Sequence, residues 1–217
     1  SNVWKIEELK NRILITLGLL LVYRFGAQVT LPGIDATQLG NLAGQTKEGI
    51  GSILDMFTGG AFSQASVFAL GIMPYISASI VVQLMGIAIP YLQKLQSDGE
   101  SGRKKINQIT RWLTIGITLV QGPTYIYNLY RTLPSNAFLL GFNSFEFLFS
   151  SVVILVTGTI FAMWLGEKIT DKGIGNGISL LIMVGILARL PQAFIQEFTT
   201  RVTNNNGGPM LLVIEII

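Results

Sequence analysis

Long uncharged stretches alternate with short charged segments along this chain. A helix needs about 20 mainly apolar residues to cross the hydrocarbon core of a membrane, and five stretches come close to that length. A sixth apolar run begins at about residue 209, near the end of the sequence. The pattern therefore predicts five membrane-spanning helices, over about residues 13–34, 72–92, 112–130, 147–166 and 178–195. It also predicts the truncated start of a sixth.

The second of these apolar regions is interrupted. Residues 56–93 carry no charge, which is far more than one span needs, and helix-breaking residues fall inside them: Gly59, Gly60, Gly71 and Pro74. A break in a membrane helix is tolerated only where protein or water surrounds it, because the freed backbone groups need partners. We expect a short re-entrant helix over about residues 52–63, then the span over 72–92 with Pro74 near its N-terminus. One kinked span with a long outer loop is the alternative.

Composition supports a membrane protein. Of the 217 residues, 50% are hydrophobic and 12% are charged, with a mean hydropathy of +0.55, whereas a soluble domain carries about 25% charged residues. The expected fold class is all-α, a polytopic membrane protein. The chain has no Cys and no His, which excludes disulfides, thiolate or imidazole metal ligands and imidazole catalysis. We expect no cofactor, no metal and no catalytic residue.

The distribution of basic residues predicts a topology. Net charge is +3, and Lys and Arg lie between apolar runs, a pattern that does not indicate DNA binding. Ten of them lie in the N-terminal segment, the loop after the second span and the turn after the fourth, and the alternating loops hold four. Because cytoplasmic loops carry the excess of Lys and Arg, we expect a cytoplasmic N-terminus.

Two local features have structural interpretations. Arg24 lies within the first span, where a charge costs at least ~2.5 kcal/mol unless it is paired or hydrated, so it is expected to face protein or water. Asp55, Gln28 or a backbone carbonyl are its candidate partners. The glycine-rich segment at 173–179 lacks the Lys and the preceding strand of a phosphate-binding loop. A turn in which Asn176 or Gly177 caps the fifth helix is expected instead.

A series of motifs runs in order along the whole chain: Gly59-Gly60-Ala61, Ala69-Leu-Gly-Ile-Met-Pro-Tyr-Ile-Ser-Ala-Ser-Ile80, Gln83-Leu84, Glu100-Ser-Gly-Arg-Lys104, Val156-Thr-Gly-Thr159, Met163-Trp-Leu-Gly-Glu167 and Gly173-Ile-Gly-Asn-Gly-Ile-Ser179. Together they resemble bacterial members of the SecY family, the pore subunits of the Sec protein translocase. That family has ten spans in two pseudosymmetric halves. The resemblance implies that residues 1–217 correspond to the N-terminal half, with the start of the sixth span, and that the chain is a fragment.

The resemblance also implies roles for individual residues. Four isoleucines match positions of a hydrophobic pore ring: Ile76, Ile80, Ile182 and Ile186. Each pair is spaced i, i+4 and so shares one helix face, and aliphatic side chains at a constriction can block ions by dewetting. The segment at 52–63 resembles the plug that closes the resting channel, which assigns these residues to it: Ile53, Leu54, Asp55, Met56, Phe57, Gly59 and Gly60. Ordinary packing is the alternative for both sets.

The same resemblance implies partners. The second and third spans resemble one wall of a lateral gate to the lipid, and Arg103, Lys104 and Lys105 lie in a basic, flexible turn that in the family helps to dock the ribosome or the SecA motor. Further implied partners are SecE, SecG, secretory preproteins, signal sequences and membrane lipid. The implied location is the inner membrane of a bacterium, and the implied function is protein conduction without enzymatic activity.

A secondary transporter with a discontinuous helix is the alternative function. Transporters of that type need polar or acidic groups near the bilayer midplane. This chain offers only Asp55 and Arg24 near that depth, against the aliphatic face formed by Ile76 and Ile80. The sequence therefore favours a channel.

Overall fold

The computed structural model describes residues 7–39, 50–134, 137–138 and 144–203. These residues form helices and turns, with no strand beyond the isolated bridges of Thr30 with Ser66 and Ile34 with Phe138. The helical elements are α1 (Glu7–Gly26), the 3-10 helix η2 (Ala36–Leu39), α3 (Ile50–Phe57), α4 (Met73–Ala88), α5 (Pro90–Ser97), α6 (Gly99–Thr132), α7 (Ser144–Lys172) and α8 (Gly177–Thr203). The all-α fold class is confirmed.

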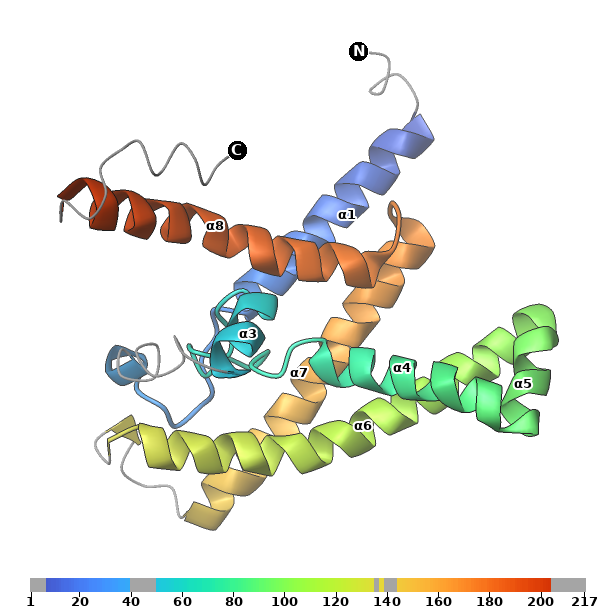
Figure 1. Cartoon of the computed structure of the whole chain (residues 1–217), viewed down its shortest axis with the longest axis horizontal. Coiled ribbons are helices and arrows are strands. Elements are labelled where there is room, and N and C mark those ends of the chain that lie inside the picture. Colours follow the sequence, from blue (N-terminus) through green and yellow to red (C-terminus); the bar gives the residue numbers. More distant parts are fainter. Residues whose placement is uncertain (1–6, 40–49, 135–136, 139–143, 204–217) are drawn as a thin grey trace.

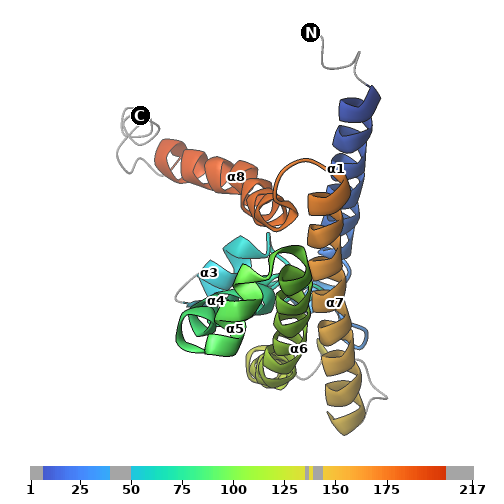
Figure 2. The same ribbon diagram turned by 90° about the vertical axis from the view of Figure 1, so that its right-hand side faces the viewer.

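Two pairs of helices organise the molecule. Helices α1 and α7 lie side by side in both views, and α4 lies along α6 (Figures 1 and 2). Helix α6 also packs against α7, which connects the pairs, and α8 packs against α1, α7 and α3. The short α3 therefore lies near the centre of the molecule, below α8 in Figure 1.

The helix α4 ends at a sharp break. Ile89 has extended backbone angles (φ −105°, ψ 115°) and Pro90 follows it as the first residue of α5. A proline excludes the preceding residue from helical geometry, and the axes of α4 and α5 differ by 103°. Helix α4 therefore ends before the predicted limit at about 92, because the apolar pattern continues past Ile89 while the helix does not.

Other helices extend beyond their predicted limits. Helix α6 begins at Gly99 rather than near 112, and α7 and α8 also exceed the predicted ranges, whereas α1 ends at Gly26 and not near 34. Hydropathy identifies the apolar part of a helix, but charged residues such as Lys and Glu continue it, since they are good helix formers. The predicted start of a sixth span at about 209 lies outside the described residues.

Among the described helices, one is long and apolar enough by itself to cross a membrane. It covers Phe145–Lys172 in α7, with a mean hydropathy of 2.1 over its most apolar window. The bent pair α4 and α5 would be a second if it counted as one span, and the apolar part of α8, Gly177–Pro191, is shorter. In α1, every stretch of 18 residues contains at least three charged side chains, which explains why it does not qualify.

Two hydrophobic clusters hold the helices together. One joins residues of α6 and α7 to the loop after α1, and the other joins α1, α7 and α8. The loop between α3 and α4 contributes to both: Phe62 and Ala69 belong to the first cluster, and Phe68 and Ile72 belong to the second. Burial of apolar surface, worth about 25 cal/mol per Å², thus fixes this loop at the centre of the fold.

Candidate functional site

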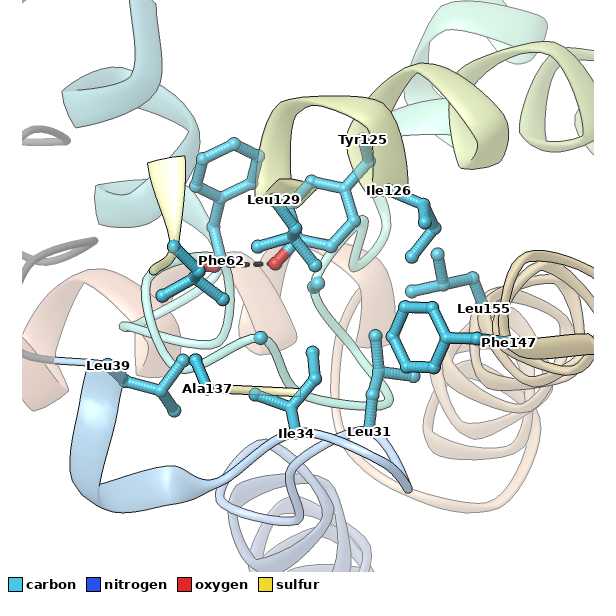
Figure 3. Close-up of a cluster of buried hydrophobic side chains, with 13 residues drawn as sticks. Leu31, Ile34, Leu39, Phe62, Tyr125, Ile126, Leu129, Ala137, Phe147 and Leu155 are labelled. Carbon is cyan, nitrogen blue, oxygen red and sulfur yellow. Dashed lines mark hydrogen bonds between the residues drawn. The ribbon is translucent and has the colours of Figure 1, made fainter. Parts of the chain in front are cut away.

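The loop that follows α3 is buried although it is irregular. Its backbone groups are satisfied by local hydrogen bonds, in which the Phe62 amide donates to Thr58 Oγ1 (3.2 Å) and the Ser66 amide donates to the Ala61 carbonyl (3.0 Å). The Tyr125 hydroxyl of α6 donates to the Phe62 carbonyl (2.8 Å), as Figure 3 shows among the surrounding apolar side chains. Such partners are what an irregular segment needs inside a protein.

Helix α3 places its residues on two faces. Ile53 and Met56 are 55% and 50% exposed, while Asp55 is 4% exposed. Leu54 and Phe57 are half-buried, and Gly59 and Gly60 are buried just beyond the helix end. The structure thus places the predicted plug residues in one short helix and its C-terminal turn. The helix itself is Ile50–Phe57, and the rest of the predicted range 52–63 is turn.

The end of α3 touches α8 through two main chains. A Cβ on Gly59 would lie 2.9 Å from the Cα of Gly185, and a Cβ on Gly185 would lie 2.7 Å from the Phe57 carbonyl oxygen. Gly59 also has a positive φ of 65°, which favours glycine because it has no Cβ to clash. Any side chain at either position would therefore separate α3 from α8.

Two arginines from different helices contact the same turn. Arg24 of α1 donates from Nη1 to the Gly59 carbonyl (2.8 Å), so a backbone carbonyl, one of the three candidate partners, is the partner of Arg24. Arg189 of α8 forms an ion pair with Asp55 and donates from Nη2 to Ser63 Oγ (3.1 Å). Asp55 also accepts the Ser63 amide (2.8 Å) at Oδ1. Arg24, Arg189 and Asp55 therefore all have partners, as charged groups in an apolar environment require.

The four ring positions lie on α4 and α8, and only two of them meet. Ile76 and Ile182 line one small cavity of about 10 Å³ together with Phe57 of α3. Ile186 is half-buried one turn further along α8, and Ile80 is 51% exposed. The described part of the chain brings Ile76 and Ile182 together against the end of α3, and it leaves Ile80 open.

A larger apolar cavity lies between α3, α4 and α6. Its volume is about 450 Å³, and its lining combines apolar side chains such as Leu70 and Met73 with the polar groups of Ser77, Gln121 and Asn128. Those polar side chains come from α4 and α6, the helices predicted to form one wall of a lateral gate. The cavity could hold an apolar segment with a few polar contacts.

The basic segment differs from its prediction. Arg103, Lys104 and Lys105 lie in the first turns of α6 and not in a flexible turn. All three are exposed, and Lys104 pairs with Glu100 (3.3 Å) one turn earlier, an i, i+4 pair that supports a helix. The chain reverses earlier, at Asp98 and Gly99, where Gly99 has a positive φ of 65°.

The turn before α8 forms as expected. Asn176 Oδ1 accepts the amides of Ile178 (3.1 Å) and Ser179 (3.2 Å), which caps the helix that begins at Gly177. This arrangement satisfies amides that have no partner within the helix. Likewise, Pro74 lies in the first turn of α4, where its missing N–H costs nothing.

Sequence reasoning missed Arg189. It is one of the four basic residues that the topology argument assigns to the alternating loops, yet it belongs to α8 and contacts the turn after α3. A signal was present, because Arg189 ends the apolar stretch that begins at Ile178, where a charge needs a partner. Asp55 gives the matching signal, because it is an acid that lies between apolar neighbours.

Comparison with known proteins matches this chain to one family, both by family model and by individual relatives. Residues 66–217 match the family model described as SecY. The protein translocase subunit SecY of Escherichia coli is 49% identical over 188 residues, which are 87% of this chain and 42% of that protein. The subunit of the same name from Vibrio cholerae is 48% identical over 212 residues, 98% of this chain and 47% of that protein. The chain thus spans about half the length of these curated relatives.

A solved structure shares the fold. The structure titled "Sec61 in the Canine ribosome-channel complex from the endoplasmic reticulum" superposes with a TM-score of 0.57 at 20% sequence identity, over 90% of this chain and 42% of that one. At that identity the similarity shows the fold alone. The helices described above are therefore arranged as in one part of a longer channel protein.

Proposed function

The chain belongs to the SecY family, and we propose on that basis that it forms the N-terminal half of a channel that conducts secretory polypeptides across a membrane and releases membrane helices into it. Membership makes it a membrane protein, and the curated relatives named above come from bacteria. A single observation carries the proposal for the site: Ile76 of α4, Ile182 of α8 and Phe57 of α3 line the same small cavity.

This convergence suits a closed pore. Ile76 and Ile182 come from different helices and line the same small cavity, and Phe57 at the end of α3 lines it with them. A constriction with an apolar lining excludes hydrated ions, because its walls offer no polar groups to replace the water that an ion must shed. We propose that Ile76, Ile80, Ile182 and Ile186 contribute to a pore ring, with Ile80 and Ile186 directed toward ring members from a second half.

We further propose that α3 and its C-terminal turn, residues 50–63, act as the plug of this channel and leave the pore when a polypeptide passes. Support comes from the contact of this segment with α8, in which Gly59 lies against Gly185 and Arg189 contacts Asp55 and Ser63. The cavity of about 450 Å³ between α4 and α6 would form part of a lateral gate.

The proposed setting is a bacterial inner membrane with the N-terminus in the cytoplasm. Arg103, Lys104 and Lys105 then lie on the cytoplasmic side, where exposed positive charge suits acidic protein surfaces or ribosomal RNA. A ribosome or the SecA motor would supply the energy, SecE and SecG would complete the assembly, and lipid would face the outer surfaces. The chain itself would act as a channel and not as an enzyme.

Cross-linking to a passing chain tests this function. The sequence has no Cys, so Ile76→Cys or Ile182→Cys, placed in a full-length subunit that contains this sequence, is a unique probe. A secretory precursor with one central Cys is stalled in the channel, and disulfide formation is scored. Tyr127→Cys is the control, because Tyr127 is 64% exposed on α6. The proposal requires cross-links at both isoleucines and none at Tyr127; an engaged precursor that cross-links at neither isoleucine refutes it.

A further inference from the structure

The charged contacts of α3 are concentrated on one residue of α8. Arg189 pairs with Asp55 inside α3 and also donates to Ser63 Oγ (3.1 Å), eight residues later in the chain. Asp55 and Ser63 are themselves joined, because the Ser63 amide donates to Asp55 Oδ1 (2.8 Å). One guanidinium thus closes a ring of three polar contacts around the turn at Gly59 and Gly60.

The surroundings make this pair strong. Asp55 is the one charged residue that is buried among those whose exposure the structure describes, and the Arg189 side chain is 37% exposed. An ionised carboxylate in an apolar environment is stable only with a partner of opposite charge and hydrogen bonds to its oxygens. Moving α3 away from α8 would separate Asp55 from its cation, and nothing else in the described contacts replaces Arg189.

The backbone next to the pair is shaped to receive the guanidinium. A Cβ on Gly60 would lie 2.9 Å from Arg189 Nη2, and Gly60 has a positive φ of 97°. The absence of a side chain at this position therefore leaves the space that the arginine head group occupies. Arg24 holds the same turn from α1, but it contacts a backbone carbonyl rather than a charge.

We infer that Arg189 is a gating residue of this protein, because its guanidinium locks α3 onto α8 through Asp55 and Ser63 and must release both for the channel to open. This inference rests on the proposed plug function of α3. It makes this ion pair one of the contacts that opening must break, so weakening the pair should make the resting channel open more often.

A double-mutant cycle tests the lock. Asp55→Asn, Arg189→Gln and the double variant are made in a full-length subunit that contains this sequence, and halide efflux from lipid vesicles reports open channels. Each single variant is expected to raise the efflux rate about tenfold, and the double variant is expected to raise it no further, because contacting residues are non-additive. Unchanged efflux in the single variants, or effects that simply multiply, would overturn the inference.

A matched control comes from another ion pair. Arg111 of α6 donates to Glu167 of α7 with two nitrogens (3.0 and 2.5 Å), and neither residue contacts α3 in the described interactions. Arg111→Gln removes an arginine–carboxylate pair of the same chemistry away from the turn. Its efflux is expected to equal that of the unmodified subunit, and an equal rise in this control would overturn the specific role of Arg189.

A disulfide separates failure of the lock from failure of the plug. Phe57 and Ile182 line the same cavity, so Phe57→Cys with Ile182→Cys should form a bond that holds α3 closed. Oxidation should return the efflux of the Arg189→Gln variant to the resting level, which misfolding would not allow. If the bond forms but the lock variants do not leak, the lock is wrong and the plug stands. If the bond forms and oxidation leaves the leak of the Arg189→Gln variant unchanged, α3 does not block the pore, so the plug proposal fails and the lock fails with it.

Discussion

If α3 is the plug proposed above, replacing Gly185 by alanine should open the channel while strengthening the helix that carries it. In a helix interior, alanine is more favourable than glycine by about 1 kcal/mol, so α8 alone should gain stability. The added methyl, however, would lie 2.7 Å from the Phe57 carbonyl and 3.4 Å from the Gly59 amide. Ordinary contacts at such atoms begin near 3.4 Å, so α3 has to move outward.

The magnitude follows from these distances. Inserting a methyl into a packed contact typically costs about 1–3 kcal/mol, and both neighbours here are backbone atoms that cannot rotate away. A cost of about 2 kcal/mol for the closed position corresponds to roughly a 30-fold rise in the open population, at 1.4 kcal/mol for each factor of ten. Because the gain in helix propensity applies to α8 whether α3 is closed or displaced, it does not offset this rise.

Halide efflux from vesicles and thermal unfolding of the purified full-length subunit measure the two effects separately. Gly116→Ala in α6 is the control, since no atom outside its own stretch of helix backbone lies within 4 Å of the position its Cβ would take. This control should gain helix stability by about 1 kcal/mol with unchanged efflux. If Gly185→Ala leaks no more than Gly116→Ala, the close approach of α3 to α8 does not hold the channel closed, and the reasoning is refuted.

Three further substitutions test the packing around this site. Tyr125→Phe leaves the buried Phe62 carbonyl without its donor and should lower the free energy of unfolding by about 1–3 kcal/mol; a change within error would show that water replaces the hydroxyl. Asn176→Ala removes the acceptor for two amides at the start of α8 and should cost about 1 kcal/mol, with Asn176→Asp restoring most of it, and an equal loss in both variants would contradict the capping role. Ile126→Ala deletes a side chain that is fully buried and should cost about 2–5 kcal/mol in chemical denaturation; a loss below 1 kcal/mol would mean that α6 and α7 close around the gap.

Several elements of the fold could be predicted because their signals are local. The apolar run at 147–166 identifies α7, Pro74 marks the start of α4, and Asn176 caps α8. The pair Gly59 and Gly60 indicates the turn after α3 for the same reason, since a positive φ is a property of single residues. In each case the side chain or its absence determines the geometry of its own neighbourhood.

Other features depend on contacts between distant residues. The pairing of Asp55 with Arg189 joins positions 134 apart in the chain, and no periodicity reports it. The isoleucines of the proposed ring share a helix face by spacing, yet spacing does not determine that Ile76 and Ile182 line one cavity while Ile80 remains exposed. That distinction arises from the relative placement of α4 and α8, which tertiary packing sets.

The contact of Gly59 with Gly185 has a consequence for how this segment can change over evolutionary time. Where two main chains touch, the need for a residue without a side chain falls on the two glycines and not on the residues that α3 presents outward. Ile53 and Met56 are each about half exposed or more, so substitutions at these two sites should leave the packing of α3 against α8 unchanged. Fluorophores or spin labels at the same two sites should therefore report the proposed movement of α3 while leaving its resting position intact.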